Sequence, residues 1–285
     1  MFDLLTDAFS SQITQRALIG GLLAATITAL VGTWVVVRGL AFFGDAMAHG
    51  VLPGIALAVI WGFDVTLGAM VSALVMVLGI NTVHRTTRLS DDTAIGLLFV
   101  GMLALGVVII SKEPTFAGDL TSFLFGDILG VRDADFRLGA AALVVAALGL
   151  LLGHRSFVAL SVSRDKAELL GLRPGLAHAA MLTLLALSIV STFRIVGTLL
   201  VFGLLVAPAA SAVLLVKRLP VAMALAVLFG WLAVVLGLTI SYHAETAASA
   251  TVAGVAVAQF FAVLIALEGA EAVRRARRVR SAGSV

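Results

Sequence analysis

Residues 195–216, IVGTLLVFGLLVAPAASAVLLV, run without a single charged side chain and decide the fold class of this chain. A helix of about 20 apolar residues spans a membrane hydrocarbon core about 30 Å thick. Seven further apolar runs approach this length: residues 17–37, 65–83, 94–110, 138–153, 176–193, 220–240 and 247–267. The pattern predicts an all-α polytopic membrane protein with about eight transmembrane helices and no soluble domain.

The composition supports the same class. Apolar residues make up 61% of the 285 positions, and charged residues make up 12%, about half of the usual share of roughly 25%. The chain has no cysteine, which excludes disulfides, thiolate ligands and cysteine nucleophiles. Any metal site must therefore use imidazole, carboxylate or backbone oxygen.

The basic residues indicate the topology. They gather in residues 85–88, 155–173, 217–218 and 274–280, which alternate with the apolar runs so that all four segments can lie on one side. The positive-inside rule makes that side cytoplasmic. We therefore attribute the pI of about 9.9 to topology and to contact of the basic tail with lipid headgroups, and expect no nucleic-acid partner.

Residues 40–62 form a ninth apolar run that is interrupted by Asp45 and His49. Full spanning gives nine crossings with the N-terminal end outside, whereas a re-entrant segment gives eight. The glycines and Pro53 in this run weaken a helix, which favours eight crossings within a range of seven to nine.

The chain divides into three parts. We expect an interfacial segment over residues 1–15, with a frayed terminus as the alternative. A permease domain then covers residues 16–268 and a basic cytoplasmic tail residues 269–285.

The stretch GDAMAHGVLPG, residues 44–54, carries the candidate metal ligands. Asp45 and His49 lie one helical turn apart on the same face. A carboxylate in hydrocarbon costs roughly 2.5–3.5 kcal/mol, so such residues usually face a cavity used by an ion or substrate. Pro53 has no N–H to donate to the His49 carbonyl and is expected to free that oxygen. Alternatively, Asp45 caps a broken helix and His49 bonds a backbone carbonyl.

One chain supplies too few ligands, since zinc usually takes four. A homodimer with a central axis brings two aspartates and two histidines together. Such a set of two nitrogens and two oxygens suits zinc or manganese.

Four blocks of the sequence resemble the zinc/manganese/iron-type ABC importer permeases (the ABC-3 type of transmembrane subunit). They are VVVRGLAFFGDAMAHGVLPGIALA at 35–58, TRLSDDTAIG at 87–96, LFGDIL at 124–129 and LLVAPAA at 204–210. The resemblance implies a homodimeric, multi-pass permease of the bacterial inner membrane. It also implies cytoplasmic ATP-binding subunits and a periplasmic or lipid-anchored metal-binding protein as partners. Asp45 and His49 match the family's intramembrane metal-coordinating pair. Two positions depart from the family pattern, Asp127 and the pair Thr246-Ala247.

Residues 163–175, SRDKAELLGLRPG, form a second candidate element within a segment spanning 161–175. Ser163 is a possible helix cap, and Gly171 with Pro174 ends the helix. The segment resembles the coupling helix by which importer permeases dock onto the ATPase. The residues assigned to this contact are Ser163, Asp165, Ala167, Glu168 and Gly171. An ordinary loop helix on the headgroups is the alternative.

Further candidates lie elsewhere. Pro208 frees the Leu204 carbonyl and is either a path or hinge residue or part of a small-residue packing face.

An acidic outer mouth that attracts cations is also expected. Its residues are Glu113, Asp119, Asp127, His243 and Glu245. His84, His154 and His178 lie beside predicted cytoplasmic ends and are interpreted as interfacial side chains rather than ligands.

These features predict the membrane subunit of an ATP-driven importer of a divalent transition metal, with zinc first and manganese or iron(II) as alternatives. The chain has no Gly-x-x-x-x-Gly-Lys-Ser/Thr loop, so ATP is expected on a partner subunit, and the permease itself is neither an enzyme nor the holder of a permanent cofactor. A siderophore or cobalamin permease and an ion-driven secondary transporter, which usually shows inverted repeats, are the other hypotheses. An intramembrane metalloprotease is disfavoured because His-Glu-x-x-His is absent.

Overall fold

The computed structural model describes residues 9, 11–87, 89–111, 128–162, 168–169 and 171–282, with side chains up to residue 272. This part of the chain is helical and contains no strand, which confirms the all-α prediction. The elements are α2 (Gln12–Val37), α3 (Ala41–Gly50), α4 (Leu52–Trp61), α5 (Val65–Thr86), α6 (Asp91–Ile110), the short 3-10 helix η2 (Ile128–Gly130), α8 (Asp133–Val162), α10 (Pro174–Val196), α11 (Thr198–Leu215), α12 (Leu219–Ala244) and α13 (Ala248–Ala282).

The described residues contain nine helices long and apolar enough to cross a membrane, the upper end of the expected range. The helix pair α3 and α4 counts as one of them, since Ala41–Trp61 covers 21 residues. The pair is broken at Val51, but the chain does not turn back there. The Val51 amide donates to the Met47 carbonyl at 3.3 Å and the Ile55 amide to the Val51 carbonyl at 3.1 Å. The preference for a re-entrant segment is therefore wrong.

Ion pairs identify the two ends of the bundle. At one end Arg194, near the end of α10, pairs with Asp135 of α8 at 3.1 Å and reaches Asp64, which precedes α5. Arg16, in the second turn of α2, pairs with Asp133 at the start of α8. We call this the outer end, because the basic loops lie at the other one. The N-terminal end of α2 is thus at the outer end, as expected for nine crossings.

The inner end holds Arg38, which follows α2. Its guanidinium donates to the Leu160 carbonyl near the end of α8 at 2.7 Å and lies 3.9 Å from Asp91, the first residue of α6. Because Arg38 is at this end and Asp64 at the other, residues 41–61 run the full length of the bundle.

Small residues let α4 pack closely on α5 and explain why the glycines are present. A Cβ added to Gly54 would lie 2.1 Å from the Gly68 carbonyl oxygen. Near the break, the Ser72 hydroxyl of α5 donates to the Gly50 carbonyl at 2.8 Å, which satisfies an acceptor that the helix no longer serves. These glycines therefore serve helix contact rather than chain reversal.

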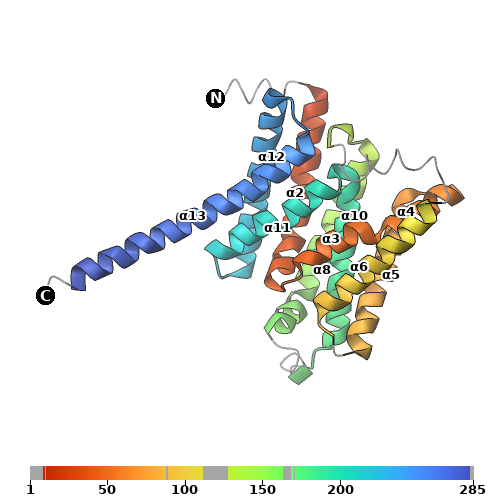
Figure 1. The fold of residues 1–285 in the computed structure, drawn as a ribbon, viewed down its shortest axis with the longest axis horizontal. Helices are drawn as coiled ribbons and strands as arrows, with labels where there is room; N and C mark the ends of the chain where they lie inside the picture. The colour runs from red at the N-terminus through yellow and green to blue at the C-terminus, as the bar shows by residue number, and fades with distance from the viewer. Residues whose placement is uncertain are drawn as a thin grey trace.

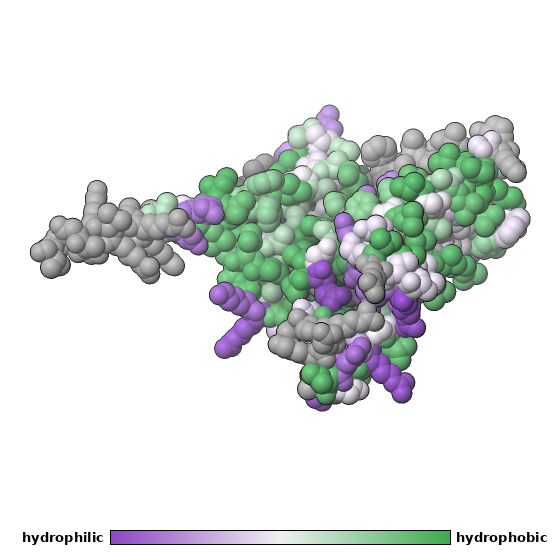
Figure 2. Space-filling view, turned by 60° about the horizontal axis from the view of Figure 1, so that its bottom comes forward, coloured by the Kyte–Doolittle hydropathy of each residue, from purple (hydrophilic) through white to green (hydrophobic). Residues whose placement is uncertain are grey.

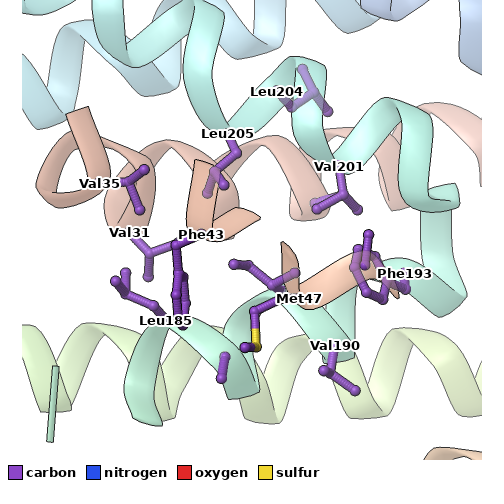
Figure 3. Packing of buried hydrophobic residues seen from close by; sticks show 14 of the residues in the cluster. Val31, Val35, Phe43, Met47, Leu185, Val190, Phe193, Val201, Leu204 and Leu205 are labelled. Carbon is purple, nitrogen blue, oxygen red and sulfur yellow. The ribbon is translucent and has the colours of Figure 1, made fainter. Parts of the chain in front are cut away.

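The core surrounds α3. Phe43 and Met47 of α3 are fully buried and point toward side chains of α2, α10 and α11, among them Val31, Leu185 and Val201 (Figure 3). The arrangement places α3 inside the bundle (Figure 1). Phe43 and Met47 are four residues apart and share a face, so the opposite face of α3 carries Asp45 and His49.

The face of the molecule seen in Figure 2 is largely apolar, as expected of a membrane-spanning bundle. Of the most apolar 18-residue stretch of each helix, only 17% is buried inside the protein in α8 and in α13, and 22% in α6. In Figure 1, α13 packs on α11 and α12 near its start and then extends away from the bundle. The predicted boundary at residue 269 does not interrupt the helix, which continues to Ala282.

Candidate metal site in the membrane helices

Asp45 and His49 lie on the face of α3 that points away from the core. The Asp45 Oδ1 and His49 Nε2 atoms are 3.9 Å apart, and the side chains are 42% and 31% exposed, respectively. Both donors are therefore reachable from outside the single chain. Two donors at this separation can rotate to share one cation, but they leave its remaining positions open.

Aromatic side chains border this pair. The His49 ring lies edge-on to Phe99 of α6, with 5.6 Å between the ring centroids, and Phe42 contacts the same ring at 5.4 Å. On the other side α11 approaches closely, since a Cβ on Gly44 would lie 2.5 Å from Leu205 Cδ2 and 3.5 Å from Phe202. The face with Asp45 and His49 thus lies between α6 and α11.

The local structure disfavours the alternative in which Asp45 is a helix cap. The N-cap of α3 is Leu40, and Asp45 lies in the second turn of the helix. Among the hydrogen bonds of the described residues, none joins the His49 ring to a backbone carbonyl. The pair is left available for a ligand.

The helix break next to Pro53 bears on the predicted role of the His49 carbonyl. Helix α3 ends at Gly50, and Pro53 lies in the first turn of α4, so the break falls where the missing N–H predicts it. The Val51 amide, however, donates to the Met47 carbonyl and also faces the His49 carbonyl. Of these two contacts only the one to Met47 is a hydrogen bond, at 3.3 Å, so the freeing of the His49 carbonyl by Pro53 stays a prediction.

Pro208 lies buried within α11, which continues through it from Thr198 to Leu215. In the preceding turn the backbone meets α2 closely, because a Cβ on Gly32 would lie 2.0 Å from the Leu205 carbonyl oxygen. The geometry favours the packing interpretation of this small-residue face over a hinge.

The other predicted sites are only partly described. Glu113, Asp119, Asp127, Ser163, Asp165 and Ala167 lie outside the described residues. Glu168 is exposed, and Gly171 has a φ of 71° and donates its N–H to the Glu168 carbonyl at 2.9 Å, so the segment ends at the predicted glycine.

His243 and Glu245 lie exposed at the outer end of α12. The His243 Nδ1 atom lies 2.9 Å from the Thr239 carbonyl oxygen, and Glu245 ends the helix with a φ of 52°. Their role in an outer mouth stays a prediction, and the described residues show no contact between them and the pair on α3.

One group of side chains at the inner end is not predicted by the sequence analysis. His84 near the end of α5, Asp91 at the start of α6 and His178 in the second turn of α10 converge at the inner end. Each histidine was judged alone as an interfacial residue. The sequence signal that could group the three residues is their depth in the membrane, since each lies beside a predicted cytoplasmic end of a helix.

Arg38 borders this inner group. Burial lowers the pKa of the Arg38 guanidinium from its usual value, and the nearby Asp91 carboxylate partly opposes that shift. The arginine stays charged even so, because the usual pKa of a guanidinium lies far above neutral pH.

The bundle of spanning helices with an acid and an imidazole on one internal helix defines a membrane permease rather than a soluble enzyme. The chain belongs to the ABC 3 transport family, whose model matches residues 10–267. This match confirms the resemblance to the zinc/manganese/iron-type ABC permeases and makes the chain a multi-pass protein of the bacterial inner membrane.

Individual relatives agree with the family. A Haemophilus influenzae protein named "Probable iron transport system membrane protein" is 33% identical over 93% of this chain and 97% of its own length. The "Manganese transport system membrane protein MntC" of Listeria monocytogenes is 34% identical over 87% of this chain and 88% of its own. The solved structure "PsaBC from Streptococcus pneumoniae in complex with Fab" superposes with a TM-score of 0.80 at 31% identity, covering 92% of this chain and 95% of that one.

Proposed function

We propose that this chain is the membrane subunit of an ATP-driven importer of a divalent transition metal. The observation that carries the proposal is the placement of Asp45 and His49 on one face of an internal helix, half-exposed and bordered by Phe99. An ionisable pair inside a membrane bundle usually marks an ion path. The family and the names of the relatives support the same conclusion.

The proposed site is completed by a second copy of the chain. One chain offers one carboxylate and one imidazole on an accessible face, and a two-fold axis beside α3 doubles the set. The ion then has two nitrogens and two oxygens as ligands. Such a site must bind the ion strongly enough to receive it and weakly enough to release it.

The metal is assigned from two lines of argument. Imidazole and carboxylate suit zinc, manganese and iron(II) alike, so the ligand types do not separate the zinc expected from the sequence from its two alternatives. The relatives carry the names of manganese and iron systems, which weighs toward manganese. We therefore propose a transport assay in which Mn²⁺, Fe²⁺ and Zn²⁺ compete, with Mn²⁺ expected to be transported and Zn²⁺ as the alternative.

The transport cycle is proposed to be alternating access. A binding protein delivers the ion at the outer end, near His243 and Glu245, and the two Asp45/His49 pairs receive it. Cytoplasmic ATP-binding subunits dock at residues 161–175, and their motion opens the inner end.

A permease for chelated metal is the second candidate, because a Yersinia pestis relative that is 31% identical is named "Chelated iron transport system membrane protein YfeD". An intact chelate fills the ligand positions of its metal and gains little from Asp45 and His49. Inhibition of uptake by a strong chelator, at constant total metal, therefore supports the free ion. Stimulation of uptake by the chelator supports the second candidate.

The site assignment is tested by metal uptake in cells whose importer carries Asp45→Ala or His49→Ala. Both variants should lose uptake while the permease still assembles, because each removes two of four ligands from the dimer. Glu268→Ala, an exposed acid on α13, is the matched control and should transport normally. Normal uptake by both site variants would eliminate the assignment.

A further inference from the structure

We propose that His84, Asp91 and His178 form a second binding site for a divalent transition metal, at the inner end of the bundle and separate from Asp45 and His49. The three side chains come from α5, α6 and α10, and their candidate ligand atoms all lie within 4.8 Å of one another. Two imidazoles and one carboxylate are a ligand set that iron(II), zinc and manganese accept.

The geometry is that of donors converging on one point. His84 Nδ1 is 2.6 Å from Asp91 Oδ1, and His178 Nε2 is 3.8 Å from the same oxygen. With metal–ligand bonds of about 2.0–2.1 Å, neighbouring ligand atoms lie roughly 3.0–3.4 Å apart. The His84 distance is shorter than this range and the His178 distance is longer, so both side chains must rotate to admit an ion. The two rings are stacked with centroids 4.8 Å apart, and their ligand nitrogens lie within 4.8 Å of each other and of the carboxylate oxygen.

Burial and space also fit an ion. The His178 side chain is only 3% exposed, and those of His84 and Asp91 are each 22% exposed. A cavity of about 160 Å³ adjoins the group and is lined by Arg38, His84, Leu160, Pro174, Gly175 and His178. The cavity has room for the waters that complete the coordination of a three-ligand site.

Arg38 faces the second oxygen of the Asp91 carboxylate. Its Nη2 atom lies 3.9 Å from Asp91 Oδ2, whereas the histidines face Oδ1. A ligating carboxylate is commonly fixed by a partner on its second oxygen, and such partners matter for affinity. The arginine charge thus orients Asp91 while Oδ1 stays directed at the imidazoles.

The location assigns a role to the bound ion. The cavity is lined by Leu160, two residues before the end of α8, and by Pro174, the first residue of α10. Leu160 lies directly before the predicted coupling segment 161–175, and Pro174 lies near the C-terminal end of that segment. A metal held by α5, α6 and α10 therefore fixes the start of α10, where the segment ends, and bound cytoplasmic metal influences the docking of the ATPase there.

The test measures metal binding by the purified permease in its complex with the ATPase, in an Asp45→Ala/His49→Ala background that removes the membrane site. The probes are Zn²⁺, followed by calorimetry, and Co²⁺, followed by its visible absorption. We expect about one ion per chain to remain bound and to raise the unfolding temperature of the complex. Binding by the background variant with tetrahedral or five-coordinate Co²⁺ bands would support the site.

Ligand variants identify the donors. Adding His84→Gln or His178→Gln should weaken Zn²⁺ binding at least about 100-fold. Replacing a residue that only hydrogen-bonds to a metal ligand already lowers metal affinity by about 10–100-fold, and these two histidines are proposed as direct ligands. His154→Phe is the control, since this histidine lies near the inner end but its ring contacts Trp34 edge-on, a contact that phenylalanine retains. No Zn²⁺ or Co²⁺ binding in the background variant overturns the proposal, as does unchanged binding when either ligand is replaced.

Discussion

The side chains of α3 show how a few residues combine a core with a candidate ion site. Phe43 and Met47 are fully buried, whereas Asp45 and His49 are half-exposed on the other side of the same ten-residue helix. The sequence spacing predicted this arrangement, since residues four apart share a helical face. What spacing cannot give is the identity of the neighbours, and Phe99 beside His49 became visible only when α6 was placed.

At this scale we first predict the effect of Asp45→Asn. The amide keeps the size and one oxygen of the side chain but loses the charge that offsets a divalent cation. Mn²⁺ affinity of the purified dimer should fall at least about tenfold, on the order of 1.4 kcal/mol per site. Calorimetry on the variant and on Glu268→Gln, a surface acid on α13, measures the difference. Equal affinity of Asp45→Asn and the parent would contradict the role of the carboxylate.

A second residue-scale prediction concerns Gly54→Ala. The added methyl would lie 2.1 Å from the Gly68 carbonyl oxygen, a backbone atom that can move only with α5. Overpacking of this kind typically costs about 1–3 kcal/mol, so the variant should unfold at a lower temperature in detergent. Gly101→Ala in α6 is the control, because nothing lies within 4 Å of its added methyl. Equal melting of the two variants would show that α4 and α5 do not pack as described.

The inner histidines mark the limit of prediction from single residues. His84 and Asp91 are seven residues apart across the connection between α5 and α6, but His178 lies far from both in the sequence. Their convergence follows from the tertiary placement of α5, α6 and α10. An interpretation of each histidine alone therefore could not find the group.

Among the elements, the sequence predicted one property of the pair α3 and α4 correctly and another wrongly. Pro53 and the nearby glycines correctly predicted a break in residues 40–62. They did not predict its direction, because a single irregular residue, Val51, is enough to interrupt the hydrogen bonds without reversing the chain. The close contact of Gly54 with α5 is a tertiary reason for glycine that composition does not reveal.

A third prediction concerns the start of α5, where Asp64 is the N-cap and its carboxylate accepts from the Leu67 amide at 3.0 Å. That hydrogen bond is the main cause that lowers the pKa of Asp64, so the charged form is favoured in the fold. The contribution to stability is therefore present above the unfolded-state pKa of about 3.9 and is lost as the pH falls through the lower folded-state value.

Asp64→Ala removes the helix cap and should lower the free energy of unfolding at neutral pH by about 1 kcal/mol. The unfolding temperature should fall accordingly. Asp64→Asn keeps an acceptor oxygen and should retain most of the stability, without the loss at acidic pH. Thermal unfolding of the three proteins at neutral and acidic pH measures both effects. A larger loss in Asp64→Asn than in Asp64→Ala would contradict the capping role.

At the scale of the whole molecule, apolar run lengths were sufficient to predict a polytopic bundle, because the bilayer sets the length of each spanning helix. The number of crossings depended on one ambiguous run and became nine among the described residues. Basic loops predicted which end is cytoplasmic. The proposed assembly with a second copy is argued from the incomplete ligand set on one chain and not from any feature of a single helix.

The topology gives a fourth prediction. The chain has no cysteine, so single cysteines report the side of the membrane without a background. Gln12→Cys, at the outer end, should react with a membrane-impermeant maleimide in intact cells whose outer membrane has been made permeable. Thr87→Cys, at the inner end, should react only after the inner membrane is opened. Labelling of both positions, or of Thr87→Cys alone, in intact cells would refute nine crossings in this orientation.

The central claim is that a cation pauses between the Asp45/His49 pairs of two chains. Anomalous X-ray scattering at the manganese absorption edge, from crystals of the homodimer with its ATPase and Mn²⁺, locates the ion directly. The account predicts a peak on the two-fold axis at bonding distance from Asp45 and His49 of both chains. A structure with bound Mn²⁺ but no peak at this position, or with these side chains turned away from the axis, would contradict it.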